Sequence, residues 1–300
     1  MRLMRRSLGI VSLLLLLLTT ASVAQVGNTP STAPFTRVVA ILSAMTVEIE
    51  TLGQELMDKK ELIIQGIQVT TGSLNERKVV LIHSGIGKVN AATTATLLIE
   101  HFQPTHILFT GIAGGLNPEL RPGDVVIGAK TAYHDFGEWT PAGFRVSQTT
   151  DPFTGQLNPL FFPGDVGLLR MANEAAPHLE LKPVNTAVGE RLPRVVTGVI
   201  VTGDAFVASP AKAKLLREEF EADATEMEGA AVAQVCWQRR VPCLILRSLS
   251  DSAGAKAPED ERLFERRAAQ NAARLVIGIV EGLELTMSIP SDGSTGARGP

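Results

Sequence analysis

Short apolar runs alternate with stretches of helical periodicity along most of the chain. Unbroken apolar runs are typical of strands buried on both faces, whereas apolar positions every three or four residues are typical of helices. The pattern predicts strands at 38–42, 62–71, 78–83, 106–110, 124–129, 195–202 and 243–249. It predicts helices at 47–57, 89–102, 166–176, 210–220, 228–239 and 259–283. This alternation predicts an α/β fold with a parallel or mixed sheet.

One long segment departs from this alternation. Residues 136–165 are rich in aromatic residues, proline and glycine, which predicts an ordered functional loop or insertion. Trp139 and Phe144 lie in this segment and are candidates for a lid or a dimer contact. No internal repeat or domain boundary interrupts residues 37–286, so we expect a single domain there.

The first 24 residues have a different pattern from the rest of the chain. Three arginines precede an apolar run from Leu8 to Leu18, and small residues follow at positions 21–24. Because the run is too short to span a bilayer comfortably, it indicates a cleaved signal peptide over residues 1–24. We therefore expect an exported protein, periplasmic or secreted, with no stable membrane anchor. Residues 25–36 are expected to form a linker, and residues 287–300 a flexible tail.

Composition narrows the class of protein. The chain has 300 residues, of which 45% are hydrophobic and 20% charged, which is typical of a globular protein and excludes wholesale disorder. Its mixed charges sum to −3, so nucleic acid is not expected to be the main partner. Two cysteines are too few for a disulfide framework, and the five histidines are scattered. Without a GxGxxG string, dinucleotide binding is not expected either, and we predict neither a metal nor a cofactor.

Polar and glycine-rich strings follow the predicted strands. They are Ser43–Glu48, His83–Lys88, Thr110–Gly115, Thr202–Phe206 and Ser250-Asp251, and a further string, Glu226–Glu228, is expected to open a helix. Ligands of α/β sheets bind outside the carboxyl ends of the strands, so these strings are predicted to line one pocket. Each string by itself can also be explained by structure alone, as a glycine turn, a solvated carboxylate in the first turn of a helix or a helix N-cap.

Taken together, the strings resemble the nucleoside phosphorylase/nucleosidase superfamily, and within it 5′-methylthioadenosine/S-adenosylhomocysteine nucleosidases. The matching strings are Ala44-Met45-x-x-Glu48, Ser84-Gly85-Ile86-Gly87-Lys88-Val89, Thr110-Gly111-x-Ala113-Gly114-Gly115, Tyr133-His134-Asp135, Gly203-Asp204-Ala205-Phe206, Glu226-Met227-Glu228 and Ser250-Asp251. The similarity covers residues 38–283. It implies a three-layer α/β/α sandwich around a mixed, partly barrel-like sheet, and a homodimer.

The resemblance implies hydrolysis of the N-ribosidic bond of a purine nucleoside such as 5′-methylthioadenosine or S-adenosylhomocysteine. Cleaving this bond builds positive charge on the ribose and negative charge on the purine, so it needs an acid, a carboxylate for the sugar and a base for water. Asp251 would protonate purine N7, oriented by Ser250, and Glu48 would be the base. Glu228 would accept hydrogen bonds from the ribose hydroxyls. The resemblance makes Glu48 and Asp251 the catalytic candidates.

The resemblance also implies which residues would form the pocket. Met227 would lie against the sugar as an apolar floor. Phe206 would stack on the purine, and Val207 would offer backbone groups to the purine edge. The remaining candidate substrate-binding residues are Ile86, which with His134 would lie near the 5′ substituent, Ile112, Ala113, Gly114 and Glu226. Ile112 stands where nucleosidases of this family commonly have a small hydroxyl residue.

Two rival functions stay open at this point. A phosphorylase needs cationic side chains to hold a phosphate dianion, and residues 43–50 contain two glutamates but no arginine or lysine, which favours water as the nucleophile. Arginines from elsewhere, such as a neighbouring subunit, would restore phosphorolysis. The second rival is a non-catalytic, exported protein that binds or stores a nucleoside.

Overall fold

The computed structural model describes residues 38–186 and 189–283. The expected signal peptide, linker and tail (residues 1–24, 25–36 and 287–300) lie outside the described residues. In the described part of the chain, no helix has the length and apolar character needed to cross a membrane.

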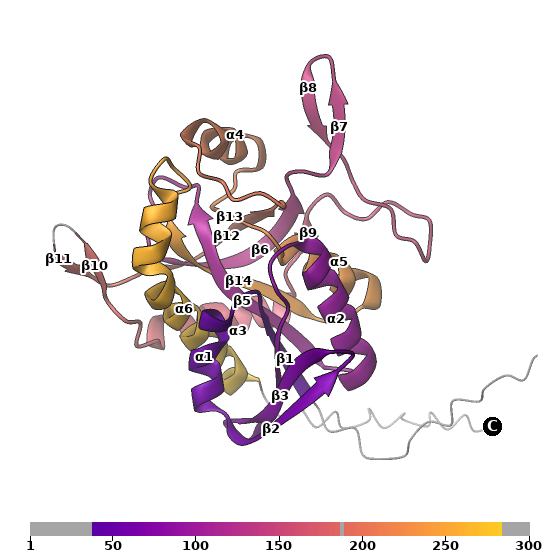
Figure 1. The fold of residues 1–300 in the computed structure, drawn as a ribbon, viewed down its shortest axis with the longest axis vertical. Helices are drawn as coiled ribbons and strands as arrows, with labels where there is room; N and C mark the ends of the chain where they lie inside the picture. The colour runs from indigo at the N-terminus through magenta and orange to yellow at the C-terminus, as the bar shows by residue number, and fades with distance from the viewer. Residues whose placement is uncertain (1–37, 187–188, 284–300) are drawn as a thin grey trace, which may run out of the picture. The chain divides into compact units, whose positions relative to one another are not determined.

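Strands and helices alternate along the chain, as the hydrophobic pattern predicts (Figure 1). The strands are β1 (Val38–Ser43), β2 (Met57–Ile64), β3 (Ile67–Leu74), β4 (Arg77–His83), β5 (His106–Gly115), β6 (Val125–Tyr133), β7 (Gly137–Thr140), β8 (Gly143–Val146), β9 (Phe162–Pro163), β10 (Val184–Thr186), β11 (Gly189–Arg191), β12 (Val195–Thr202), β13 (Ala224–Glu226) and β14 (Cys243–Asp251). The helices are α1 (Thr46–Glu55), α2 (Lys88–Phe102), α3 (Val166–Ala175) with a short 3₁₀ turn (Ala176–His178), α4 (Pro210–Phe220), α5 (Gly229–Arg239) and α6 (Ala257–Gly282).

One mixed sheet forms the centre of the domain, with strands in the order β13-β12-β6-β14-β5-β1-β4-β3-β2 and β9 paired with β6. β13 also pairs antiparallel with β5, so β13, β12, β6, β14 and β5 form a closed ring. β5, β1 and β4 continue from the ring as parallel neighbours. The expectation of a mixed, partly barrel-like sheet is therefore confirmed.

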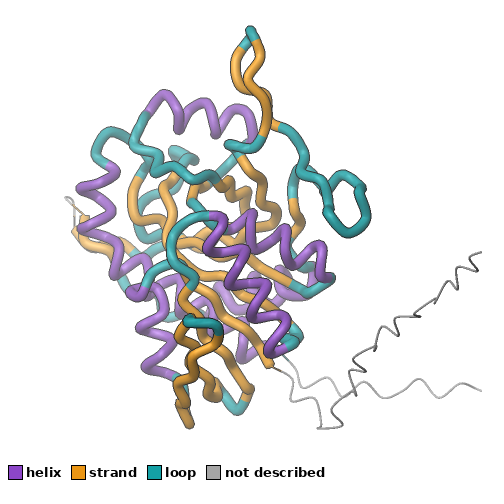
Figure 2. Tube along the Cα trace, turned by 45° about the vertical axis from the view of Figure 1, so that its right-hand side comes forward, coloured by secondary structure: helices purple, strands orange, loops and turns teal. Residues whose placement is uncertain are grey.

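Helices cover both faces of the sheet because strand side chains alternate between the faces. In β1, Ala40 and Leu42 pack in one apolar cluster together with α2 and α5. Val39 and Ile41 pack in a second cluster with α1, α3 and α6. Figures 1 and 2 show these two sets of helices on opposite sides of the strands. The three-layer α/β/α arrangement follows from this alternation.

The structure corrects two element boundaries near the N-terminus. The strand expected at 62–71 is really two strands, β2 and β3, joined by a tight turn at Gln65-Gly66, where both residues have positive φ. The helix expected at 47–57 ends at Glu55, and Met57 already belongs to β2. β2 is an exposed edge strand rich in charged residues. Its hydrophobicity therefore does not alternate with the two-residue period that marks a strand.

Three further differences lie close to the predicted pocket. β5 and β14 extend through the glycine-rich and acidic strings, which the sequence pattern placed after the strands. Glu226 ends β13 and does not open a helix, because α5 begins at Gly229. The segment 136–165 contains a β-hairpin (β7 and β8) and the short β9.

Candidate active site

The carboxyl ends of β5 and β14 form the base of the candidate site. The two strands run parallel, with Arg247 paired to Gly111, Ser248 to Ile112 and Leu249 to Ala113. The register then shifts, so that Asp251 pairs with Gly114. Such an irregularity re-aims side chains and is frequent next to active sites. It places Ser250 and Asp251 beside the end of β5.

Backbone N–H groups from two strand ends hold the carboxylate of Glu48, in the first turn of α1. Its Oε2 accepts hydrogen bonds from the N–H groups of Ala44 and Met45, both at 2.8 Å. Its Oε1 accepts one from Ile112 N–H at 2.9 Å. Burial raises the pKa of Glu48, although the Arg247 charge and these N–H groups oppose the shift. With about two acceptor sites on each oxygen, Oε1 keeps one for a further donor.

Two glycines of β5 are required by the close approach of these acids. A Cβ on Gly111 would lie 2.7 Å from Oε1 of Glu48 and 3.2 Å from Nη1 of Arg247. A Cβ on Gly114 would lie 3.0 Å from Oδ1 of Asp251. The glycine-rich string therefore leaves space for carboxylates on the two sides of one strand.

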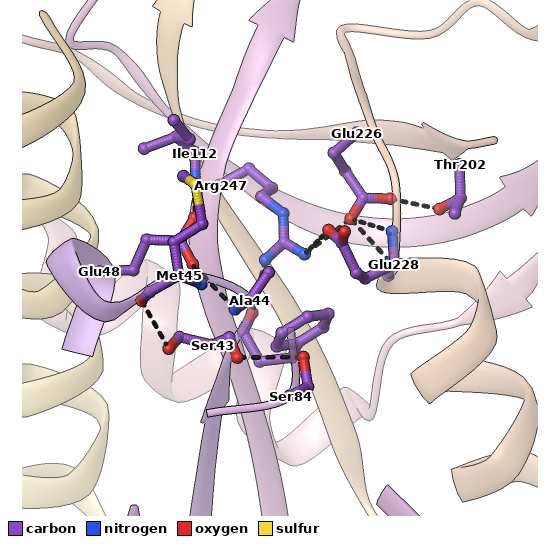
Figure 3. Close-up of polar contacts among 12 residues, drawn as sticks. Ser43, Ala44, Met45, Glu48, Ser84, Ile112, Thr202, Glu226, Glu228 and Arg247 are labelled. Atoms are coloured by element: carbon purple, nitrogen blue, oxygen red, sulfur yellow. Dashed lines mark hydrogen bonds and ion pairs between the residues drawn. The ribbon is translucent and has the colours of Figure 1, made fainter. Parts of the chain in front are cut away.

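Arg247 is an almost completely buried cation at the centre of the site (Figure 3). Its Nη2 donates to Oε2 of Glu226 at 2.6 Å and lies 4.0 Å from Oε2 of Glu228. Its Nη1 donates to the carbonyl oxygen of Phe109, and its guanidinium lies 4.2 Å from the centre of the Phe109 ring. Loss of either side chain would leave the other as an unpaired buried charge. Glu226 and Arg247 therefore stabilise each other inside the site.

The carboxylate of Glu226 accepts hydrogen bonds from several side chains and backbone N–H groups. Besides Arg247, it accepts hydrogen bonds from the Thr202 hydroxyl and from the N–H groups of Glu228 and Gly229. The last two belong to the start of α5, where a carboxylate offsets the unpaired N–H groups and the helix dipole. Glu226 thereby fixes the start of α5, where Glu228 is the N-cap residue.

Glu228 connects α5 to the glycine turn before α2. Its Oε1 accepts a hydrogen bond from Gly87 N–H at 2.7 Å. Burial, with the nearby Glu226 charge, raises the pKa of Glu228 to about 7, while Arg247 and the Gly87 N–H oppose the shift. A carboxylate with this pKa changes its charge near neutral pH.

Asp251 ends β14 and is also buried. Ser250 Oγ lies 2.8 Å from its Oδ2, and Ala253 N–H donates to its Oδ1 at 2.7 Å. Burial raises the pKa of Asp251, although both hydrogen bonds oppose the shift. Ser250 Oγ also lies 3.3 Å from the carbonyl oxygen of Ala113. A carboxyl group with a raised pKa, fixed by two donors, is suited to transfer a proton.

The candidate purine-binding segment, residues 203–207, is fastened to the start of α2. Oδ1 of Asp204 accepts from Lys88 N–H at 2.8 Å, and Lys88 Nζ lies 2.7 Å from Asp135 and 3.7 Å from Asp204. Asp204 N–H donates to Asp135 Oδ2 at 2.8 Å. Phe206, two residues further on, is 48% exposed, whereas Val207 is buried. We call Lys88, Asp135 and Asp204 the lysine cluster.

The structure gathers most of the predicted residues but not all of them. Glu48, Ile112, Glu226 and Glu228 surround Arg247 or its partners, and Ser250, Asp251, Ala113 and Gly114 lie along the same two strand ends. Met227 is half-buried between the two glutamates. Ile86 and Phe206 are exposed at the surface, and His134 is buried with its ring against Gly203. Their roles in binding stay predictions.

Sequence reasoning missed Arg247 and the lysine cluster. The signal for Arg247 was present, because an arginine inside an otherwise apolar strand must find a buried acidic partner. The lysine cluster joins three segments far apart in the chain, which no local pattern connects. Within residues 38–186 and 189–283, no group of three or more His, Cys, Asp or Glu side chains is arranged to hold a metal ion.

Comparisons with known proteins identify the family of this chain. The family model of the phosphorylase superfamily matches residues 38–281. A 5′-methylthioadenosine/S-adenosylhomocysteine nucleosidase of Psychromonas ingrahamii is 39% identical over 249 residues, which cover 82% of this chain and 99% of that one. The solved structure of such a nucleosidase from Neisseria meningitidis, in complex with methylthio-immucillin-A, is 39% identical, with a TM-score of 0.72 over 82% of this chain and 100% of that one. A futalosine hydrolase of Helicobacter pylori is 30% identical, with a TM-score of 0.70 over 83% of this chain and 99% of that one.

Proposed function

This chain belongs to the phosphorylase superfamily, and we propose that it hydrolyses the N-ribosidic bond of 5′-methylthioadenosine and S-adenosylhomocysteine, releasing adenine. It is an N-ribosyl hydrolase. The observation that carries the proposal is the arrangement of Glu48, Glu228 and Asp251 around the ends of β5 and β14, with one buried arginine already paired to Glu226.

Asp251 is proposed to be the general acid. Purine N7 gains electron density as the N-ribosidic bond breaks, so a proton delivered there neutralises the leaving group. The raised pKa of Asp251 keeps that proton available at a higher pH than an ordinary aspartate would. Ser250 and the Ala253 N–H fix the carboxyl group, so little reorganisation is needed when the purine leaves.

Glu228 is proposed to hold the ribose. Its Oε1 is fixed by Gly87 N–H, whereas its Oε2 lies 4.0 Å from Arg247 Nη2, too far for a hydrogen bond, and would accept from the sugar hydroxyls. Ionised Glu228 would also stabilise the positive charge that develops on the ribose. Met227 would lie against the sugar, and Phe206 and Val207 would contact the purine.

Glu48 is proposed to position and deprotonate the attacking water. Three backbone N–H groups fix its carboxylate, and the free acceptor site on Oε1 is available to a water hydrogen. The raised pKa of Glu48 makes it a stronger base than an exposed glutamate. Proton abstraction would leave a hydroxide equivalent beside the anomeric carbon.

Electrostatics favour water over phosphate. Glu48, Glu226 and Glu228 surround the single arginine of this cluster, and that arginine is hydrogen-bonded to Glu226 at 2.6 Å. A phosphate dianion placed beside these glutamates would meet repulsion without a free cation to offset it. The same excess of negative charge stabilises a cationic ribose.

Product analysis tests the proposal. Purified mature protein is incubated with 5′-methylthioadenosine, S-adenosylhomocysteine, adenosine and inosine, with and without phosphate, and the products are separated by chromatography. We expect free adenine and free thioribose from the first two substrates at rates independent of phosphate. Formation of a sugar 1-phosphate would overturn hydrolysis, and binding without any base release would support the storage protein.

We also propose that the protein forms a homodimer. Supporting this, the segment 136–165 carries large apolar side chains exposed to solvent, among them Trp139 (83% exposed), Phe153 and Leu157. Ile86, next to the Gly87 N–H that bonds Glu228, and Phe206 are exposed as well. Burial in a second copy of the chain would remove these side chains from water.

Export is proposed from the sequence of residues 1–24 alone. We expect cleavage after Ala24, which removes three arginines and changes the formal net charge from −3 to −6. Intact-mass measurement of protein from a periplasmic fraction checks this. A full-length mass, or recovery only from the cytoplasm, would contradict it.

A further inference from the structure

The turn between α5 and β14 brings the end of the helix next to the start of the strand. Arg240, the residue after α5, has a left-handed φ of 56°, and its N–H donates to the carbonyl oxygens of Cys236 and Trp237. Val241 N–H donates to the carbonyl oxygen of Cys236 at 3.0 Å. Cys243, two residues after Val241, therefore starts β14 close to the last turn of α5.

The side chains of Cys236 and Cys243 are buried in the same layer of the domain. Side chains of a strand alternate between its two faces. Leu244 packs in the cluster with α3 and α6, whereas Cys243 and Ile245 pack in the cluster with α2 and α5. Cys236 belongs to the cluster with α2 and α5 as well and is 1% exposed. Cys243 therefore faces the helix that carries Cys236, and both residues line one cavity.

These two thiols are neighbours without being bonded. They are the only cysteines of the chain, and both are free. Burial raises the pKa of Cys236, and the adjacent Cys243 thiol raises it further. In a disulfide the two Cβ atoms are about 3.8 Å apart. We expect small rotations of the two side chains to bring the sulfur atoms within bonding distance.

We propose that Cys236 and Cys243 form an intrachain disulfide in the mature protein, which joins the end of α5 to the start of β14. An external disulfide, such as glutathione disulfide, is the oxidant. The thiolate of one cysteine attacks it and releases one thiol, and the other cysteine then displaces the second thiol. The two cysteines lose two electrons and two protons, and the external disulfide gains both and becomes two thiols.

The bond is expected to form before the fold is complete. The thiolate is the attacking species, and burial keeps the Cys236 thiol protonated in the folded protein. In the unfolded chain neither thiol is buried, so both are open to the oxidant. Disulfides form in the periplasm and outside the cell, where such oxidants are supplied. The inference therefore takes from the proposed function only the export of the chain, as the source of the oxidant.

The disulfide would act away from the candidate active site. Glu228 is the N-cap of α5 and Asp251 ends β14, whereas the two cysteines lie at the opposite ends of these elements. A bond between Cys236 and Cys243 closes a loop of eight residues, which removes conformations from the unfolded chain. We therefore expect a gain in stability without any new chemical group at the site.

Peptide mapping tests whether the bond forms. Reduced, urea-unfolded mature protein is refolded into a mixture of reduced and oxidised glutathione, or into dithiothreitol, and is then alkylated and digested with trypsin without reduction. Trypsin cleaves after Arg239 and Arg240, between the cysteines, so only a disulfide keeps the two peptides together. We expect the linked pair from glutathione and two alkylated cysteines from dithiothreitol. Alkylated or glutathione-bound cysteines in the glutathione sample, or a covalent dimer on a non-reducing gel, would overturn the proposal.

Thermal unfolding of the two samples measures the effect of the bond. Closing the loop should place the Tm of the glutathione sample about 5 °C above that of the dithiothreitol sample. Cys243→Val, which keeps an apolar side chain of similar size, is the matched control and should have the same Tm in both. The proposal is overturned by an equal Tm of the two wild-type samples, or by the same difference in Cys243→Val. Glutathione supplies the oxidant and no step measures activity, so a failure of the proposed export or hydrolysis leaves this result unchanged.

Discussion

At the scale of single residues, Asp251 is the acid whose proposed role requires a proton. We expect Asp251→Asn to lower kcat roughly a hundredfold or more, because an amide of the same shape does not donate a carboxyl proton to purine N7. Steady-state kinetics with 5′-methylthioadenosine measures this. Asp58→Asn, at an exposed position of β2, is the matched control and should be as active as wild type. A wild-type rate in Asp251→Asn would remove Asp251 from the mechanism.

Glu228 gives the reaction a pH dependence. Its pKa is about 7, and the ionised form is the one that accepts hydrogen bonds from the ribose and stabilises a cationic sugar. We therefore expect kcat/KM to rise with pH through about 7. Profiles between pH 5 and 9 measure it, and a flat profile across pH 6–8 would exclude this titration from catalysis.

The same shift affects stability. Because the folded-state pKa of Glu228 is raised above its ordinary value of 4.5, the contribution of this group to stability is present below pH 4.5 and is lost as pH rises through about 7. Glu228→Gln does not titrate, so its free energy of unfolding relative to wild type should increase between pH 5 and 8. Urea unfolding at the two pH values compares them.

At the scale of elements, β5 tolerates only glycine at position 111. A Cβ there would meet Glu48 and Arg247, so Gly111→Ala should displace the carboxylate that holds water and lower kcat about tenfold or more. Gly53→Ala in α1 is the matched control, because its Cβ has open space. That control should keep full activity and gain roughly 0.5–1 kcal/mol of stability. Equal kinetics for the two variants would contradict the steric argument.

The lysine cluster ties the start of α2 to the segment carrying Phe206. Its members are partly exposed, so its contribution is modest, about 1 kcal/mol. We expect Lys88→Met to raise KM about fivefold while kcat stays within about twofold, and Lys88→Arg to restore most of the affinity. Lys214→Met, which breaks an exposed pair within α4, is the control. A fall in kcat at unchanged KM would rule out a positioning role.

At the scale of the whole molecule, the hairpin of β7 and β8, which exposes Trp139, is expected to be buried in a dimer. Trp139 and Phe144 pack edge to face with ring centres 5.3 Å apart, and Trp139 is the most exposed large apolar residue of the described chain. Trp139→Glu should shift the mass measured by light scattering from dimer towards monomer. Leu263→Glu, a similar change at an exposed position of α6, should not. A monomeric wild-type protein at micromolar concentration would refute the dimer.

The sequence by itself determined most elements and their order. The first and last residues of β12 and α4 agree with the hydrophobic pattern. The period of a strand or a helix depends on residues that are neighbours in the sequence, so a local pattern is enough to predict it. The strings at the strand ends and their resemblance to a known family identified Glu48, Glu228 and Asp251 as candidates. The structure placed these residues around the ends of β5 and β14.

Tertiary structure decided what depends on residues distant in the chain. The pairing of β13 with β5 closes the ring, and this contact joins positions more than a hundred residues apart. The partner of Arg247, the raised pKa of Glu228 and the lysine cluster likewise follow from which side chains meet in the fold. Periodicity is a local property, whereas burial and charge pairing depend on spatial neighbours, and for that reason the sequence pattern did not supply them.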